Sequence, residues 1–97
     1  MSRLQLAVEQ IIFARDYTIR LLDETPAAEW FRQPPGGVSH IAWQVGHLAF
    51  AEHTLVLCDI RDPHPQYSDL IWGARHEMLH AGQIGLLRRQ LGYAPLW

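Results

Sequence analysis

Apolar residues recur at three- and four-residue steps along three long segments of the chain, and two proline-containing loops separate these segments. The segments run from Ser2 to Leu22, from about His40 to Leu57, and from Ser68 to about Leu91. Residues three and four apart share one face of an α-helix, so this spacing is typical of amphipathic helices. No strand pair or internal repeat is visible. The pattern therefore predicts an all-α fold, an antiparallel up-down helical bundle of three main helices joined by short connections.

Cap residues support these boundaries. Ser2, Ser39 and Ser68 precede the three segments, and serine is a preferred N-cap. Gly92 follows the third segment, where a C-cap glycine belongs. The spacing in the first segment also predicts which residues face the core. They are Leu4, Val8, Ile11, Ile12, Arg15, Ile19 and Leu22.

The length of 97 residues predicts one domain over residues 1–97. Hydrophobic residues make up 48% of the chain and charged residues 19%, which is enough apolar surface to bury a core. The net charge of −2 gives no electrostatic case for nucleic acid or an anionic membrane surface. No uninterrupted apolar run approaches the roughly 18 residues of a membrane span.

The cysteine content and the N-terminal residues bear on location. Cys58 is a lone cysteine, which rules out an intramolecular disulfide and fits a reducing compartment. The first residues lack the charge and apolar pattern of a signal peptide. We therefore expect a soluble cytoplasmic protein with a buried, inert thiol.

Three histidines suggest a metal site. His76 and His80 lie four residues apart in the third segment, so both imidazoles project from one face of a helix. His47, midway along the second segment, would complete a set of three nitrogen ligands if the two helices face each other. Three protein ligands with open positions are typical of catalytic metal sites more than of structural ones. The alternative is that these are ordinary polar or core histidines.

The same stretch also spells the zinc-protease motif HExxH, with Glu77 as the general base. That reading needs a third ligand downstream, and no His, Asp or Glu follows His80. It also needs a sheet to bind extended substrate. Glu77 is then better interpreted as a helix-surface residue, or as one that orients a ligand imidazole from a neighbouring helix.

Two segments resemble one known family. Ser39–Ala49, with the sequence SHIAWQVGHLA, is similar to the second helix of DinB-like proteins, and His76–Gly92 resembles their last helix. The ending Ala94–Trp97, the first helix and the Trp30–Phe31 turn fit one subgroup of the same family. The resemblance covers nearly the whole chain.

The resemblance implies a four-helix bundle in which His47, His76 and His80 hold a divalent metal. Imidazole ligands suit zinc or nickel. It also implies a reaction class, because characterised relatives include thiol-dependent transferases and isomerases whose metal activates a low-molecular-weight thiol. We therefore expect thiol transfer or hydrolysis on a small molecule, although the sequence does not decide whether the chain is an enzyme.

The sequence departs from the family pattern between the second and last helices. Family members carry another long helix there, whereas this chain has only the loop Asp59–Tyr67 before Leu70 runs into the last-helix motif. This implies an internal deletion near residues 59–70 and a DinB-like bundle shortened to three main helices. A second copy of the chain would cover the exposed groove, so we expect a homodimer. The alternative function is a non-catalytic helical dimerisation or interaction module without a functional metal.

Several other residues are assigned roles. His40 and Gln83 are candidates to line the site, although a helix-start role for His40 and a helix–helix hydrogen bond for Gln83 are equally consistent. Trp43 is a candidate pocket residue, and Trp43, Trp72 and Trp97 are expected to pack the core. The simpler interpretation of Arg75, Arg88 and Arg89 is a solvated face that complements the helix dipole. His53 and His64 are expected not to be ligands.

Overall fold

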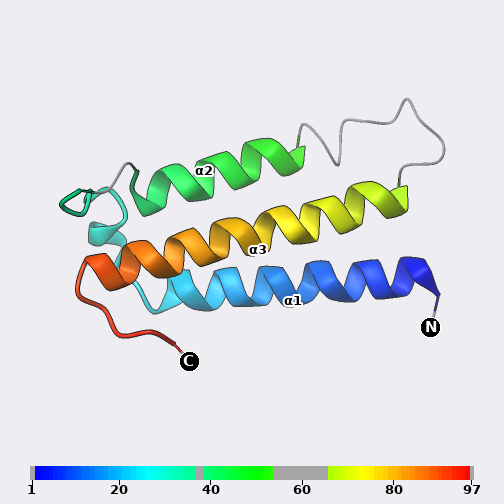
Figure 1. The fold of residues 1–97 in the computed structure, drawn as a ribbon, viewed down its shortest axis with the longest axis horizontal. Coiled ribbons are helices and arrows are strands. Elements are labelled where there is room, and N and C mark those ends of the chain that lie inside the picture. Colours follow the sequence, from blue (N-terminus) through cyan, green and yellow to red (C-terminus); the bar gives the residue numbers. More distant parts are fainter. Residues whose placement is uncertain (1, 37–38, 54–65, 97) are drawn as a thin grey trace.

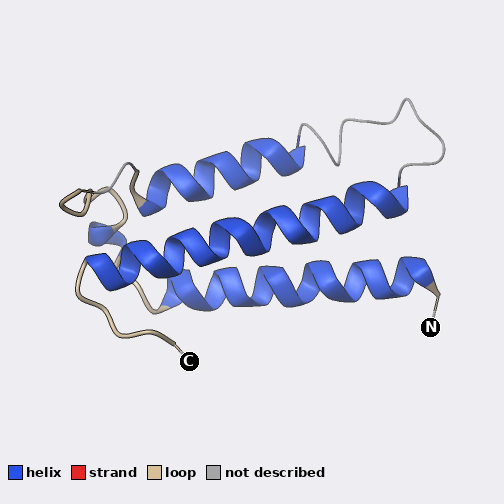
Figure 2. Cartoon of the chain, in the orientation of Figure 1, coloured by secondary structure: helices blue, strands red, loops and turns tan. Residues whose placement is uncertain are grey.

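The computed structural model describes residues 2–36, 39–53 and 66–96, and these residues form helices and connecting turns without a strand (Figure 2). The elements in chain order are α1 (Arg3–Asp23), a short 3-10 helix η1 (Ala27–Glu29), α2 (Ile41–Glu52) and α3 (Gln66–Gln90). The prediction of an all-α fold with three main helices is confirmed. The predictions for Cys58, His64 and Trp97, and for the second helix beyond residue 53, lie outside the described residues.

The three long helices lie side by side, with α3 between α1 and α2 (Figure 1). Helices α1 and α3 run in the same direction and α2 runs in the opposite one, which gives the expected up-down-up order. The most extensive packing joins α1 to α3, and α2 packs mainly on α3. None of the helices among the described residues combines the length and the hydropathy of a membrane-spanning segment.

Two helix ends have the predicted caps. The Ser2 hydroxyl accepts from the Gln5 amide at 3.1 Å, and the Gln5 side chain accepts from the Ser2 amide at 2.7 Å, which is a capping box. At the other end of the chain Gly92 has a φ of 100°, a left-handed conformation that favours glycine. The amides of Gly92 and Tyr93 donate to carbonyls of the last turn of α3, as in a Schellman motif.

Two predicted caps are wrong. Helix α2 is capped by His40 instead of Ser39, because the His40 Nδ1 accepts a hydrogen bond from the Trp43 amide at 3.0 Å. Ser68 lies inside α3, which already begins at Gln66, so the predicted loop ends earlier than expected. Imidazole nitrogen can satisfy a free helix amide as a serine hydroxyl does, and sequence alone does not rank the two.

The buried face of α1 differs from the predicted one, and of the predicted stripe only Ile11 and Leu22 are partly buried. Leu4, Val8 and Ile19 are exposed, and Ile12 is 53% exposed. The side chains buried instead are Ala7, Ala14, Thr18 and Leu21. These residues are mostly small, as are Ala74 and Ala81 on α3, and small side chains let two helices approach closely. The larger apolar residues of α1 therefore form a second face that the described part of the chain leaves exposed.

Arg88 is buried, although its position near the end of α3 suggested a solvated arginine. It is only 3% exposed and donates to the Leu21 carbonyl at 3.3 Å, to the Thr25 hydroxyl, and to the Ala94 carbonyl at 3.4 Å. The guanidinium thus binds the carboxyl end of α1, where the helix dipole is negative, and also the C-terminal segment. The prediction that Arg88 complements a helix dipole named the carboxyl end of its own helix, α3. The guanidinium instead binds the carboxyl end of α1.

Replacing Arg88 by Met is expected to lower the free energy of unfolding by about 2 kcal/mol, because buried carbonyl and hydroxyl groups lose their donor. Arg89→Met is the matched control, since Arg89 is the exposed neighbour on the same helix. Urea unfolding followed by circular dichroism measures both variants. Equal stability of the two variants would contradict the role assigned to Arg88.

Candidate metal centre

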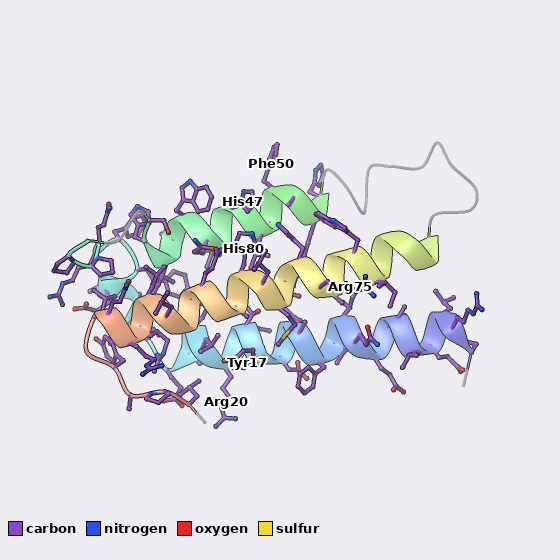
Figure 3. The ribbon with its side chains drawn as sticks, viewed as in Figure 1. Tyr17, Arg20, His47, Phe50, Arg75 and His80 are labelled. Carbon is purple, nitrogen blue, oxygen red and sulfur yellow. The ribbon has the colours of Figure 1, made fainter. Side chains whose placement is uncertain are left out.

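Helices α2 and α3 bring the three predicted ligands together. The candidate ligand atoms of His47, His76 and His80 all lie within 4.8 Å of one another. The side chains of His47 and His80 occupy the space between α2 and α3 (Figure 3). The Nε2 atoms of His76 and His80 are 3.0 Å apart. Zinc–nitrogen bonds of about 2.0–2.1 Å separate tetrahedral ligands by roughly 3.3 Å, so small side-chain movements would let this group hold one ion.

Gln44 fixes the orientation of His80, which is itself buried. The Gln44 Oε1 lies 2.5 Å from the His80 Nδ1, and the Gln44 Nε2 donates to the Ser39 hydroxyl at 3.0 Å. An amide oxygen only accepts, so the His80 Nδ1 carries the proton and Nε2 keeps its lone pair for a ligand role. Such a partner for a ligating imidazole is typical of metal sites.

Sequence reasoning missed Gln44. The signal was present, because Gln44 precedes His47 by three residues and therefore lies on the same side of α2. Its partner His80 is 36 positions away, however, and only the packing of α2 on α3 brings the two together.

Two tryptophans flank the histidines instead of packing the core. Trp43 stacks on His47 with ring centroids 4.9 Å apart, and Trp72 stacks on His76 at 4.6 Å. Each tryptophan precedes its histidine by four residues, one turn earlier on the same helix. Trp43 is 51% exposed and Trp72 is 40% exposed, so the prediction that they fill the core is wrong. Each indole covers one face of its imidazole and leaves the in-plane ring nitrogens uncovered.

Two of the three histidines have lowered pKa values. Burial lowers the pKa of the His76 and His80 imidazoles below the ordinary value of 6.5, and the neighbouring histidines lower both further. The nearby Glu52 raises the pKa of His76, and a hydrogen bond with Gln83 raises that of His80, both as smaller effects. Neutral imidazole is the form that binds a metal ion, so the environment favours the ligating state at neutral pH.

Glu77 takes part in a different cluster. It is 2% exposed, and its Oε1 accepts from the Arg15 Nε at 2.6 Å. The Arg15 Nη2 also binds the Glu52 Oε2 at 2.5 Å, so one α1 arginine links α2 and α3. Burial raises the pKa of the Glu77 carboxyl, Arg15 lowers it, and the nearby Glu52 raises it. The carboxylate that would be the base in a zinc protease is thus held by Arg15.

A cavity of about 750 Å³ adjoins His80. His40, Trp43 and Gln83, three predicted pocket residues, are among its lining residues. His40 also caps α2. His53 lies at the end of α2 and is not one of the three grouped histidines.

Comparison with known proteins gives a family match. The model of the family described as the DinB superfamily matches residues 10–69. This range includes most of α1, all of α2 and His47, and ends before His76 and His80. No curated protein and no solved structure matches the chain.

Proposed function

Since this chain belongs to the DinB superfamily, we propose that it binds one divalent transition metal, zinc or nickel, through His47, His76 and His80. The observation that carries the proposal is the approach of three imidazoles from two helices to within 4.8 Å of one another. The donor set fits such an ion, because the His80 tautomer leaves Nε2 free of a proton and burial lowers the pKa of His76 and His80, which favours their neutral form.

The proposed activity is a metal-dependent transfer of a low-molecular-weight thiol, or a hydrolysis, on a small molecule in the cytoplasm. A bound ion would supply Lewis acidity and a lowered pKa for a coordinated water or thiol. The residues of the chain contribute the rest. Gln44 orients His80, Trp43 and Trp72 limit rotation of the other two imidazoles, and the cavity beside His80 admits the substrate.

Metal analysis tests this proposal. Protein purified without a histidine tag is expected to carry about one zinc or nickel ion per chain, and His76→Ala is expected to lose most of it. His53→Ala is the matched control, because that histidine is not in the group. Mass spectrometry of the dissolved protein gives metal identity and stoichiometry. Metal content well below one ion, or unchanged in His76→Ala, would contradict the proposal.

We also propose that the partner is a second copy of the chain. Leu6, Phe13 and Met78 line an apolar groove of about 580 Å³ between α1 and α3, with Glu9 and Arg75 also on its wall. One acidic and one basic residue make the groove self-complementary, because a two-fold axis can place each opposite its counterpart. This exposed face also favours the second candidate function, a non-catalytic dimerisation module.

The oligomeric state tests that pairing. Wild-type protein is expected to sediment as a dimer, and Phe13→Glu is expected to shift it to monomer by burying a charge without a partner. Phe50→Glu is the comparison, because Phe50 projects from α2 away from α3 (Figure 3). Analytical ultracentrifugation distinguishes the states. A monomeric wild-type protein, or a dimer that persists in Phe13→Glu, would refute this interface.

A further inference from the structure

The cavity beside His80 extends along one side of α3. His80, Gln83, Leu87 and Gln90 line it, at steps of three and four residues, so they share a face of the helix. Ten residues separate His80 from Gln90, which corresponds to about 15 Å along the helix axis. Trp43 of α2 is also a lining residue. The cavity is therefore elongated, and one end of it is the candidate metal ligand.

The lining combines apolar and polar side chains, and the described residues that form it include no arginine, lysine, aspartate or glutamate. The Gln44 amide is already engaged with His80 and Ser39. Gln83 and Gln90 are exposed on the cavity side of α3. Gln83 also hydrogen-bonds to His80, but an amide group has two donor hydrogens and an acceptor oxygen, so it can bind a ligand as well. The exposed indole of Trp43 adds a flat apolar surface. The wall thus offers uncharged hydrogen-bond donors and acceptors and one aromatic surface.

From this lining we infer that the cavity beside His80 selects an uncharged substrate whose planar, amide-like group binds Gln83 and Gln90 and packs near Trp43. At the Gln90 end, about 15 Å along the helix from His80, a carboxylate or an ammonium group would give up hydration without meeting an opposite charge among the described lining residues. A neutral amide would exchange its water contacts for equivalent ones on glutamine. The inference rests on the proposed function only for the metal and its chemistry at the His80 end. Recognition of the rest of the ligand depends on side chains of this chain and needs no metal.

Three probes that share one ring test the charge selectivity. Benzamide is neutral, benzoate is anionic and benzamidine is cationic at neutral pH, and their planar groups have similar shape. Each is titrated into the full chain, as isolated and supplemented with zinc, while NMR follows the side-chain amide signals of Gln83 and Gln90. Gln90 is the decisive reporter, because it lies about 15 Å along the helix from His80, and an anion bound only to metal would not reach it.

Benzamide is expected to shift both glutamine signals with a millimolar Kd, about tenfold tighter than benzoate or benzamidine. The double variant Gln83→Leu/Gln90→Leu is expected to lose most of the benzamide binding, measured by the chemical shifts of the benzamide ring. Gln10→Leu, an exposed glutamine on α1 in the other groove, is the matched control.

Binding of benzoate or benzamidine at Gln90 as tight as that of benzamide would overturn the inference. A lack of any benzamide-dependent shift at Gln83 and Gln90, or full benzamide binding by the double variant, would also overturn it. The metal content of the same samples reports on the proposed function separately. A chain that binds no metal yet prefers benzamide would refute the metal proposal and keep the cavity assignment.

Discussion

Chelation by EDTA is expected to lower the melting temperature of the tag-free protein by roughly 15 to 30 °C. A ligand that binds only the folded state and is present at about a thousand times its Kd stabilises that state by about 4 kcal/mol. For a domain of this size, each 1 kcal/mol corresponds to about 4–8 °C. The effect is large here because the metal would join α2 to α3, the less extensively packed helix pair.

Thermal unfolding followed by circular dichroism, with and without EDTA, measures this effect. The control is His76→Ala, whose melting temperature is expected to be low already and insensitive to the chelator. His53→Ala is expected to respond to EDTA as the wild-type protein does. If EDTA leaves the wild-type melting temperature unchanged, the histidine group does not bind a stabilising ion and the non-catalytic module becomes the better interpretation.

The EDTA effect should also depend on pH. The pKa values of His76 and His80 are lowered in the folded protein, so the unfolded chain takes up protons first as the pH falls. The stabilising contribution of these groups is complete above the ordinary value of 6.5, and is lost as the pH falls from there through the lowered pKa values. Protons also compete with the metal for the same nitrogens. The difference between melts with and without EDTA is therefore expected to narrow steadily below pH 6.5.

Arg15→Met is expected to lower the free energy of unfolding at pH 7 by about 3 kcal/mol, because it leaves the Glu77 carboxylate buried without its partner. The variant also removes the ion pair between Arg15 and Glu52, which ties α1 to α2. That second contact is more exposed to solvent and should contribute less. Urea unfolding measures the change, and Arg89→Met provides a control for the loss of an exposed arginine.

Two further measurements distinguish the loss of the Arg15–Glu77 ion pair from a general loss of packing. The double variant Arg15→Met/Glu77→Met is expected to regain most of the lost stability, because an apolar pair of similar size can replace a buried ion pair. The loss of unfolding free energy caused by Arg15→Met should also become smaller at low pH. Burial raises the pKa of Glu77 in the folded protein, so the penalty for its charge exists above the ordinary value of 4.5 and disappears below it. A cost that is independent of pH, or a double variant no more stable than Arg15→Met, would contradict the assignment.

Local rules predicted the helices well. The capping box at Ser2 and the left-handed Gly92 follow from short-range backbone chemistry, and both are present. The His76–His80 pair was also predictable, since four residues make about one helical turn. These features depend on residues within a few positions of one another, and helical geometry fixes how such residues lie.

The surroundings of the site were less predictable. The sequence suggested that His47 would face the pair, but not that Gln44 would hold His80 or that Trp43 and Trp72 would flank the group half exposed. Hydrophobic character alone assigns a tryptophan to a core. A core position also requires a neighbouring element to cover it, and over the described residues only three long helices are available.

Residue spacing alone predicts the three amphipathic helices and the two histidines on one face of the last. Helix packing selects which side of α1 is buried, and it brings Arg15 and Arg88 to partners 62 and 67 positions away. Helix α1 has apolar residues on both sides, so its periodicity fits two orientations equally well. The choice depends on how closely the small residues of α1 allow α3 to approach, and that energy exists only once the helices are packed.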